Sequence, residues 1–278
     1  MYCLVMNNFK KRAFTGIILF TVITFAVSWN SYSFLVLIFI INLLSLTEFY
    51  NLFQTEDIFP RKLAGFVLSL SLIITFYVVL LGFINWKLLL LNIPIIFLIF
   101  ISELYLKAVK PFYNLAFTFL GLIVVTIPIL FFIAIPFLSA SRVYQFQIIL
   151  GYLFMLWAND TFAYLTGKTL GKHALFKRIS PGKTWEGSLG GLIGCLFVSQ
   201  IVSFYFSILQ INQWMIISFI IVITGTYGDF IKSLLKRSLN LKDSGNLLPG
   251  HGGMLDRFDS LLGSAPFVFL YLILFNEA

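Results

Sequence analysis

Long runs of apolar residues dominate the chain, and short polar segments separate them. Nine runs approach the ~20 residues that a helix needs to cross a bilayer. They cover residues 13–29, 33–53, 63–83, 88–104, 114–138, 146–166, 188–208, 213–235 and 260–276. The apolar positions are continuous rather than alternating, which disfavours a transmembrane β-barrel. Because backbone groups in lipid must find partners within the protein, the pattern predicts an all-α, polytopic bundle of about nine transmembrane helices.

Composition and charge agree with this pattern. The chain is 60% hydrophobic and only 11% charged, whereas soluble domains carry roughly 25% charged residues. If the N-terminus is cytoplasmic, nine spans leave only Lys87 and Arg142, of 19 lysine and arginine residues, on the outer side. The sequence therefore predicts a multi-pass protein of the cell membrane with a cytoplasmic N-terminus. A cleaved signal peptide ending near Ala26-Val27-Ser28 is the less favoured alternative.

The net charge of +8 is explained by basic loops that face anionic lipid, so we expect no nucleic-acid partner. The two cysteines, Cys3 and Cys195, are too few for a disulfide framework and suggest no metal or redox site.

Few polar residues interrupt the apolar runs of residues 1–145. Glu48 and Glu103 lie near the ends of runs, where an interfacial position explains them better than catalysis does. We therefore expect residues 1–145 to form a scaffold of lipid-facing or dimerising helices. The chemistry is expected in residues 146–278, around a polar cavity on the cytoplasmic side.

The sixth run contains an acid, Asp160, next to Asn159. Asp160, Tyr164 and Gly167 have the i, i+4 and i+7 spacing of one helical face. An acidic residue at membrane depth is a functional hypothesis by default. The alternative is a hydrogen-bonded polar residue that holds two helices together.

A basic segment, residues 167–187, follows this run. It carries five cationic residues, Lys168, Lys172, Lys177, Arg178 and Lys183, which could either bind lipid head groups or form a polyphosphate site. The piece SPGKT resembles the end of a P-loop, but a P-loop needs glycine five positions before Gly182, and Lys177 stands there. We therefore exclude a P-loop and predict that Ser180 and Pro181 begin a helix.

The densest group of charges lies between residues 228 and 260. Asp229, Lys232, Ser233, Lys236 and Arg237 have the i, i+3, i+4, i+7 and i+8 spacing of one helical face. The eighth run therefore leaves the membrane with an acid at its deep end and bases toward the cytoplasm.

Glycines and acids follow this helix. Glycine next to His251 lets a backbone approach a ligand closely, and its N–H groups can hold phosphate oxygens. Asp256 and Asp259 come at the start of the last run and are neighbours if that segment is helical. Asp229 lies 27 residues before Asp256 on an antiparallel helix, so the two acids can converge.

Hard oxygen ligands without cysteine favour Mg²⁺ over zinc. Carboxylates around a metal, with lysine and arginine on the substrate oxygens, suit phosphoryl or nucleotidyl transfer. The alternative is a charged loop without chemistry, which does not need this density of glycine, histidine and acid.

One pattern carries a family resemblance. The segment from Ser233 to Asp259 has the pattern Ser233-x-Leu235-Lys236-Arg237, four residues, Lys242-Asp243-x-Gly245, two residues, then Leu248-Pro249-x-His251-Gly252-Gly253-Met254-x-Asp256-Arg257-Phe258-Asp259. Over these 27 positions it resembles, without departure, the signature of phosphatidate cytidylyltransferases, or CDP-diacylglycerol synthases. Residues 159–167 and 180–187 are similar to two further blocks of that family. The resemblance covers roughly residues 150–275, and the N-terminal half matches only as a set of apolar helices.

The resemblance implies that phosphatidate and CTP react to CDP-diacylglycerol and pyrophosphate with Mg²⁺, with or without a second cation. It also implies a homodimer. The phosphate of phosphatidate is already anionic near neutral pH, since its second pKa is about 6 by analogy with phosphoserine. We therefore expect no strong general base, and catalysis by positioning and charge neutralisation.

Residue chemistry and resemblance together give three groups of candidates. The predicted metal ligands are Asp229, Asp256 and Asp259. The predicted catalytic residues are Asp160, Lys236, Arg237, Asp243 and Arg257. The predicted substrate-binding residues are Lys183, Glu186, Ser233, Lys242, His251, Gly252 and Gly253.

Two other functions stay open at this point. A related transferase could act on another lipid acceptor, such as an isoprenoid-ether analogue of phosphatidate or a polyprenol. A transporter or channel could use Asp160 and Asp229 as an ion path, although the polar residues cluster on one side of the membrane rather than across it.

Overall fold

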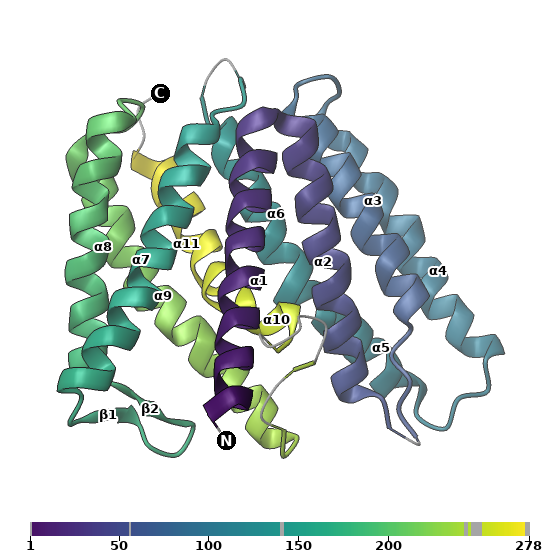
Figure 1. The fold of residues 1–278 in the computed structure, drawn as a ribbon. Helices are drawn as coiled ribbons and strands as arrows, with labels where there is room; N and C mark the ends of the chain where they lie inside the picture. Colours follow the sequence, from purple (N-terminus) through teal and green to yellow (C-terminus); the bar gives the residue numbers. More distant parts are fainter. Residues whose placement is uncertain (1, 56, 140–141, 242–243, 246–251, 276–278) are drawn as a thin grey trace.

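The computed structural model describes residues 2–55, 57–139, 142–241, 244–245 and 252–275, and Figure 1 shows its helices. The elements are, in chain order, α1 (Tyr2–Trp29), α2 (Ser31–Phe53), α3 (Lys62–Leu80), η1 (Trp86–Leu91), α4 (Asn92–Tyr105), α5 (Pro111–Gly121), η2 (Leu122–Thr126), α6 (Ile127–Ala134), η3 (Ile135–Phe137), α7 (Phe146–Leu170), β1 (Ala174–Phe176), β2 (Ser180–Thr184), α8 (Trp185–Tyr205), α9 (Ile211–Ser238), α10 (Met254–Arg257) and α11 (Asp259–Phe275). Each of the nine apolar runs falls on helix, which confirms the predicted all-α class.

Most of these helices suit a membrane. Within the described residues, seven helical segments are long and apolar enough to cross one: Ser31–Phe53, Lys62–Leu80, Trp86–Tyr105, Pro111–Phe137, Phe146–Leu170, Trp185–Tyr205 and Ile211–Ser238. Gly16–Trp29 and Asp259–Phe275 are apolar but shorter. The protein is therefore a polytopic helical membrane protein, while a count of nine spans stays a prediction.

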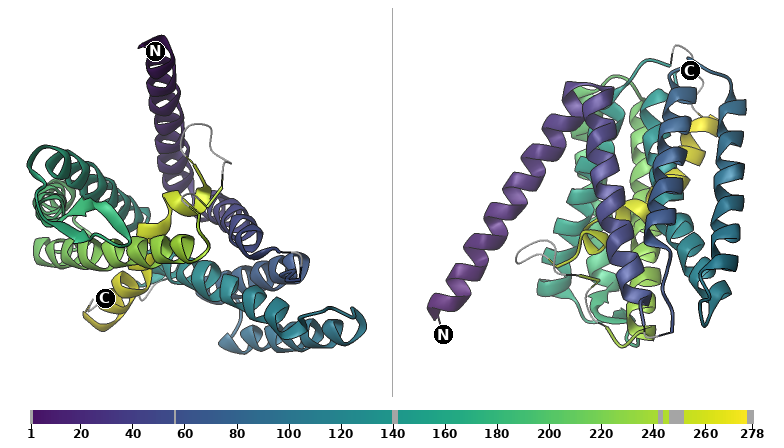
Figure 2. Two further views of the ribbon diagram at one scale, coloured as in Figure 1. Left: turned by 90° about the horizontal axis from the view of Figure 1, so that it is seen from below. Right: turned by 90° about the vertical axis from the view of Figure 1, so that its right-hand side faces the viewer.

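Different elements lie at the two ends of the helix bundle. The N-terminal end of α1 and the β1–β2 hairpin lie at one end, and α11 finishes at the other (Figure 1). Two further views show that α1 leans away from the other helices toward its N-terminal end (Figure 2). The basic hairpin and the start of the chain therefore face the same side.

The basic segment 167–187 differs from its prediction. Ser180 and Pro181 do not begin a helix; they lie in β2, which pairs antiparallel with β1. The helix α8 starts only at Trp185, because Thr184 is its N-cap and its hydroxyl accepts a hydrogen bond from Gly187 N at 3.1 Å. Lys183 therefore extends from a strand edge rather than from a helix.

Glycines let α8 approach α7 closely. Gly187, Gly190, Gly191 and Gly194 are buried in α8, at a spacing that places them on one face. A Cβ at Gly191 would lie 2.5 Å from the Asn159 side-chain oxygen, and one at Gly194 would lie 2.3 Å from the Phe162 ring. The close packing fixes the part of α7 that carries Asp160.

A second glycine contact joins α9 to α11. A Cβ at Gly228 would lie 2.6 Å from the Cα of Gly263, and one at Gly263 would lie 2.7 Å from the Cα of Gly228. Backbone meets backbone at this crossing, so neither position tolerates a side chain without movement. The crossing lies directly beside Asp229 on α9.

Polar residues also connect the N-terminal helices. Asn42 of α2 donates to Ser69 Oγ of α3 at 2.6 Å, the Ser69 and Thr126 hydroxyls are 3.0 Å apart, and Thr126 Oγ1 donates to Asn42 Oδ1 at 3.0 Å. All three are buried. Thr126 lies in the π-helical turn η2, just before Pro128. This closed ring holds three helices together.

Candidate active site

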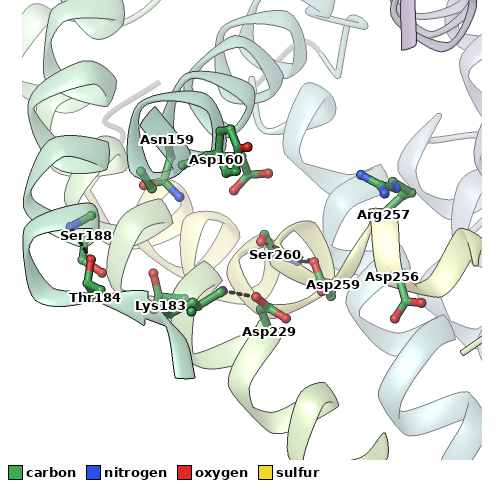
Figure 3. A pocket seen from close by; sticks show the side chains of 15 residues that line it. Asn159, Asp160, Lys183, Thr184, Ser188, Asp229, Asp256, Arg257, Asp259 and Ser260 are labelled. Carbon is green, nitrogen blue, oxygen red and sulfur yellow. Dashed lines mark hydrogen bonds and ion pairs between the residues drawn. The ribbon is translucent and has the colours of Figure 1, made fainter. Parts of the chain in front are cut away.

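One cavity of about 340 Å³ gathers polar residues from six elements (Figure 3). Its walls come from α7, from β2 and the start of α8, from α9, and from the segment containing α10 and the start of α11. The lining residues are Asn159, Asp160, Ala163, Tyr164, Gly182, Lys183, Thr184, Gly187, Ser188, Thr226, Asp229, Asp256, Arg257, Asp259 and Ser260. The structure thus brings Asp160, Lys183, Asp229, Asp256, Arg257 and Asp259 together in one cavity, while their roles there stay predictions.

The ammonium of Lys183 reaches across from β2 and forms an ion pair with Asp229 on α9 (Figure 3). Ser233, one helical turn after Asp229, donates to its other carboxylate oxygen at 3.3 Å. Burial lowers the pKa of Lys183, against the opposite influence of nearby carboxylates. Lys183 is therefore a partly desolvated cation at the wall of the cavity.

Asp256 is held by two donors. Its Oδ1 lies 2.6 Å from Lys236 Nζ, and its Oδ2 accepts a hydrogen bond from Ser244 N at 2.9 Å. Burial by itself raises the pKa of Asp256, but the hydrogen bonds from Lys236 and Ser244 outweigh it and leave the pKa below its usual value. Asp256 is consequently a carboxylate throughout the neutral range.

Asp259 and Asp160 add two more carboxylates to the wall of the cavity. Asp259 begins α11, and its carboxylate accepts from Ser260 N at 2.6 Å. Asp160 projects from α7 beside Asn159, which is buried. Asp256 and Asp259 belong to two different helices, since Phe258 interrupts the segment between them, yet both line the cavity.

Several predicted residues lie elsewhere. Arg237 is exposed and donates to the carbonyl oxygens of Ile179 and Leu241, at 3.5 and 3.2 Å. Glu186 contacts His173, with 2.6 Å between the carboxylate and Nδ1, and accepts from two backbone N–H groups of the hairpin. These two residues shape the hairpin and its surroundings. Their predicted direct roles in substrate binding and catalysis stay predictions.

The glycine-rich return is only partly described. Lys242, Asp243 and His251 lie outside the described residues. Gly252 has a φ of +81°, a left-handed conformation that favours glycine, and Gly253 is buried against protein side chains.

Sequence reasoning missed two kinds of residue. Asn159, Thr184, Thr226 and Ser260 line the cavity. Asn159 and Thr184 fall in the two further family-like blocks, Ser260 follows Asp259 directly, and Thr226 lies about one helical turn before Asp229. Lys232 was recognised on the polar face of α9 but not proposed for the site. Its ammonium is buried and has no hydrogen-bonding partner within the part of the chain that the structure describes.

Glu48 and Glu103 were expected near the membrane interface, and the structure adds their surroundings. Both are buried inside the protein, at 2% and 8% exposure. Each has partners that explain its burial, and Glu48 contacts the segment that carries Asp256.

Whether the acids of the cavity can bind Mg²⁺ depends on a phosphate that enters together with the metal. No group of three His, Cys, Asp or Glu residues forms a metal cluster among the described residues. Four aspartates nevertheless line one cavity, and two of them, Asp229 and Asp256, are paired with lysines. Mg²⁺ usually binds one or two carboxylates together with substrate phosphates and waters. The acids therefore fit Mg²⁺ when a phosphate enters with it.

Comparison with known proteins agrees with this geometry. The model of the cytidylyltransferase family matches residues 10–275. The chain belongs to this family. Among its members, the phosphatidate cytidylyltransferase of Rickettsia bellii is 39% identical over 163 residues, which is 56% of this chain and 69% of the relative.

Two further members of the family give the same result. The phosphatidate cytidylyltransferase of Staphylococcus haemolyticus is 43% identical over 136 residues, 48% of this chain and 52% of the relative. That of Bacillus subtilis is 42% identical over 123 residues, 44% of this chain and 46% of the relative. The matched segments thus span about half the length of these two cytidylyltransferases.

Proposed function

We propose that this chain is a phosphatidate cytidylyltransferase, which converts phosphatidate and CTP to CDP-diacylglycerol and pyrophosphate in phospholipid biosynthesis. The observation that carries the proposal is the cavity in which four carboxylates, Lys183 and Arg257 converge from different elements of a membrane bundle. Such a site can receive one substrate from the lipid and one from water. The names of the similar enzymes point to the same reaction.

A phosphate oxygen of phosphatidate attacks the α-phosphorus of CTP, and the bond to the β-phosphate breaks to release pyrophosphate. The nucleophile is already anionic, so the protein needs to position it rather than deprotonate it. Lys183 and Arg257 bind phosphate oxygens, and Lys236 keeps Asp256 ionised and oriented until the cation binds. Asp160 completes the wall opposite α11.

The acids supply the place for the cation. Asp229, Asp256 and Asp259 would hold Mg²⁺, with a second cation where both substrates are bound. When bound, Mg²⁺ neutralises charge on the phosphates during transfer. The lysines that pair with Asp229 and Asp256 would then be free to bind phosphate oxygens.

We also propose that the enzyme is a homodimer of the cell membrane with nine spans, its N-terminus and cavity facing the cytoplasm. The distribution of lysine and arginine supports this orientation. The position of the α1 N-terminal end at the same end of the bundle as the hairpin agrees with it (Figure 1). Labelling of cysteines introduced next to Lys87 and Lys177 from either side of sealed vesicles tests it.

The decisive experiment is pyrophosphate release by the purified protein in detergent, with CTP and phosphatidate, with and without Mg²⁺. We expect release that needs both substrates and stops with EDTA, with CDP-diacylglycerol as the lipid product. A parallel panel with an ether analogue and a polyprenol tests the acceptor. Ion flux in proteoliposomes without pyrophosphate release would instead indicate a transporter.

A further inference from the structure

A buried carboxylate from the N-terminal half contacts the segment that leads into α11. Glu48 lies on α2 and is 2% exposed. Its Oε1 accepts a hydrogen bond from Met254 N at 2.9 Å, and its Oε2 accepts one from Leu255 N at 2.8 Å. The Ser244 hydroxyl donates to Oε2 at 3.2 Å. Three donors from a segment about 200 positions away therefore converge on this side chain.

The short helix α10 explains why such an acceptor is needed. The first N–H groups of a helix have no partner within the helix, and a side chain at the N-cap normally supplies one. The N-cap of α10 is Gly253, which has no side chain to offer. Met254 and Leu255 are buried, so unpaired N–H groups there would be costly. Glu48 caps α10 from another helix.

The backbone at two glycines around this contact lies very close to the Glu48 carboxylate. A Cβ at Gly253 would lie 2.5 Å from Glu48 Oε2, and a Cβ at Gly245 would lie 2.7 Å from Oε1. Both distances are far below van der Waals contact. The group that lies close to the backbone at Gly245 and Gly253 is therefore the Glu48 carboxylate, a side chain of the protein itself.

The contact reaches the cavity through two short links. Asp256 and Arg257 follow Leu255 directly in α10, and both line the cavity. Ser244 joins the two sites, because its hydroxyl binds Glu48 while its N–H binds Asp256 Oδ2. A shift of the Glu48 carboxylate would move α10 and Ser244 together.

We propose that Glu48 is a positioning residue of the active site: it caps α10 from α2 and thereby fixes Asp256 and Arg257 in the cavity. The N-terminal helices then contribute to catalysis through this carboxylate, not only as a scaffold. The proposal rests on the proposed function for the identity of the substrates, but the geometry of α10 can be tested without turnover.

Glu103 offers a matched control. It is also a buried carboxylate of the N-terminal half, at 8% exposure. Its partner is Arg61, whose Nε and Nη2 both donate to it, the latter at 3.0 Å. Glu103 lies on α4, and α4 makes its contacts with α3, η1 and α5. Its loss should disturb the bundle without reaching α10.

The experiment compares Glu48→Gln with Glu103→Gln in detergent. Three quantities are measured: the melting temperature, the affinity for Mn²⁺ by electron paramagnetic resonance in the presence of CTP, and the kcat and KM for CTP. We expect Glu48→Gln to weaken Mn²⁺ binding and lower kcat/KM by roughly 10-fold or more, as loss of a residue that orients metal ligands does. Glu103→Gln should lower the melting temperature and leave Mn²⁺ affinity and KM unchanged.

Ser244→Ala provides a milder variant if Glu48→Gln does not fold. It removes one hydrogen bond to Glu48 but keeps the backbone donor to Asp256, so roughly a threefold change in the same direction is expected. The proposal is overturned if the folded Glu48 or Ser244 variant shows wild-type Mn²⁺ affinity and KM, whatever its melting temperature. Absent pyrophosphate release by the wild type would refute the proposed function, while Mn²⁺ binding would still test the role of Glu48.

Discussion

Polar residues are used in opposite ways in the two halves of this membrane protein. In the N-terminal half, Asn42, Ser69 and Thr126 form a closed ring of uncharged groups that bond directly to one another. In the C-terminal half, Asp229 and Asp256 form ion pairs with lysines at the wall of an open cavity. Both groups lie among apolar helices, so polarity at membrane depth does not by itself indicate chemistry.

The energetics support this distinction. Hydrogen bonds between membrane helices stabilise a bundle by about 0.6 kcal/mol on average, which suits a ring that only joins helices. Buried ion pairs are weak evidence for stability, since desolvation offsets much of their attraction. The charges around the cavity are therefore better explained by substrates that carry phosphate. Glu48 combines the two roles: it is a charged residue of the N-terminal half, and it orients Asp256 and Arg257 in the C-terminal half.

The largest effect is expected from Asp256→Asn. The change removes a negative charge from the cavity but keeps an acceptor for Ser244 N, so the fold should persist. We expect turnover with CTP, phosphatidate and Mg²⁺ to fall at least about 100-fold, because the variant would hold the charge-neutralising cation poorly and a lost charge-stabilising contact costs this much or more. Asp57→Asn is the control, because Asp57 is exposed and pairs with Lys110 outside the cavity. Unchanged turnover in Asp256→Asn would remove this residue from the site.

A smaller effect on activity is expected from Gly228→Ala. The new Cβ would meet the Gly263 backbone at 2.6 Å, so α9 and α11 must separate and carry Asp229 and Asp259 apart. We expect a loss of about 1–3 kcal/mol of stability, seen as a lower melting temperature, together with reduced kcat.

The matched control for this crossing is Gly225→Ala, one turn earlier on α9. There the new Cβ would have its nearest contact at 3.4 Å, with Ser260 O, which is ordinary contact distance. Equal losses in the two variants would show that the tight crossing at Gly228 does not set the geometry of the acids.

The smallest effect, and one on stability alone, is expected from Asn42→Leu. The change opens the ring and leaves the Ser69 and Thr126 hydroxyls with one partner fewer, at a cost of about 1 kcal/mol. The melting temperature should fall slightly while kcat and KM for CTP stay at wild-type values. Thr47→Val, which removes a hydroxyl bonded to Leu43 O of its own helix, should change neither. A raised KM in Asn42→Leu would break the contrast between the two halves.

The candidate site was predicted in large part because its charges are local exceptions in an apolar sequence. Asp160 and Asp229 stand out within apolar runs, and Lys183 and Asp256 lie in the polar segments between runs. All four line the cavity. The hairpin was missed because the pairing of β1 with β2 depends on backbone hydrogen bonds between residues such as Ala174 and Thr184, which residue type alone does not reveal.

Glu48 shows the other limit of sequence analysis. Its position near the end of an apolar run favoured an interfacial side chain, and nothing nearby in the sequence indicates its partners. Those partners, Met254 and Leu255, lie at the far end of the chain and bind it through backbone N–H groups. Such groups are the same in every residue type except proline, so they carry no sequence signal.

The sequence by itself determined that this is a bundle of apolar helices, and it placed the predicted chemistry in the C-terminal half. Both follow from local properties, the length of apolar runs and the rarity of charge within them. Tertiary structure alone decided that Lys183 pairs with Asp229, that Lys236 pairs with Asp256, and that Glu48 caps α10. These pairings depend on how closely helices cross, and the close approach at Gly228 and Gly263 becomes visible only when the two backbones meet.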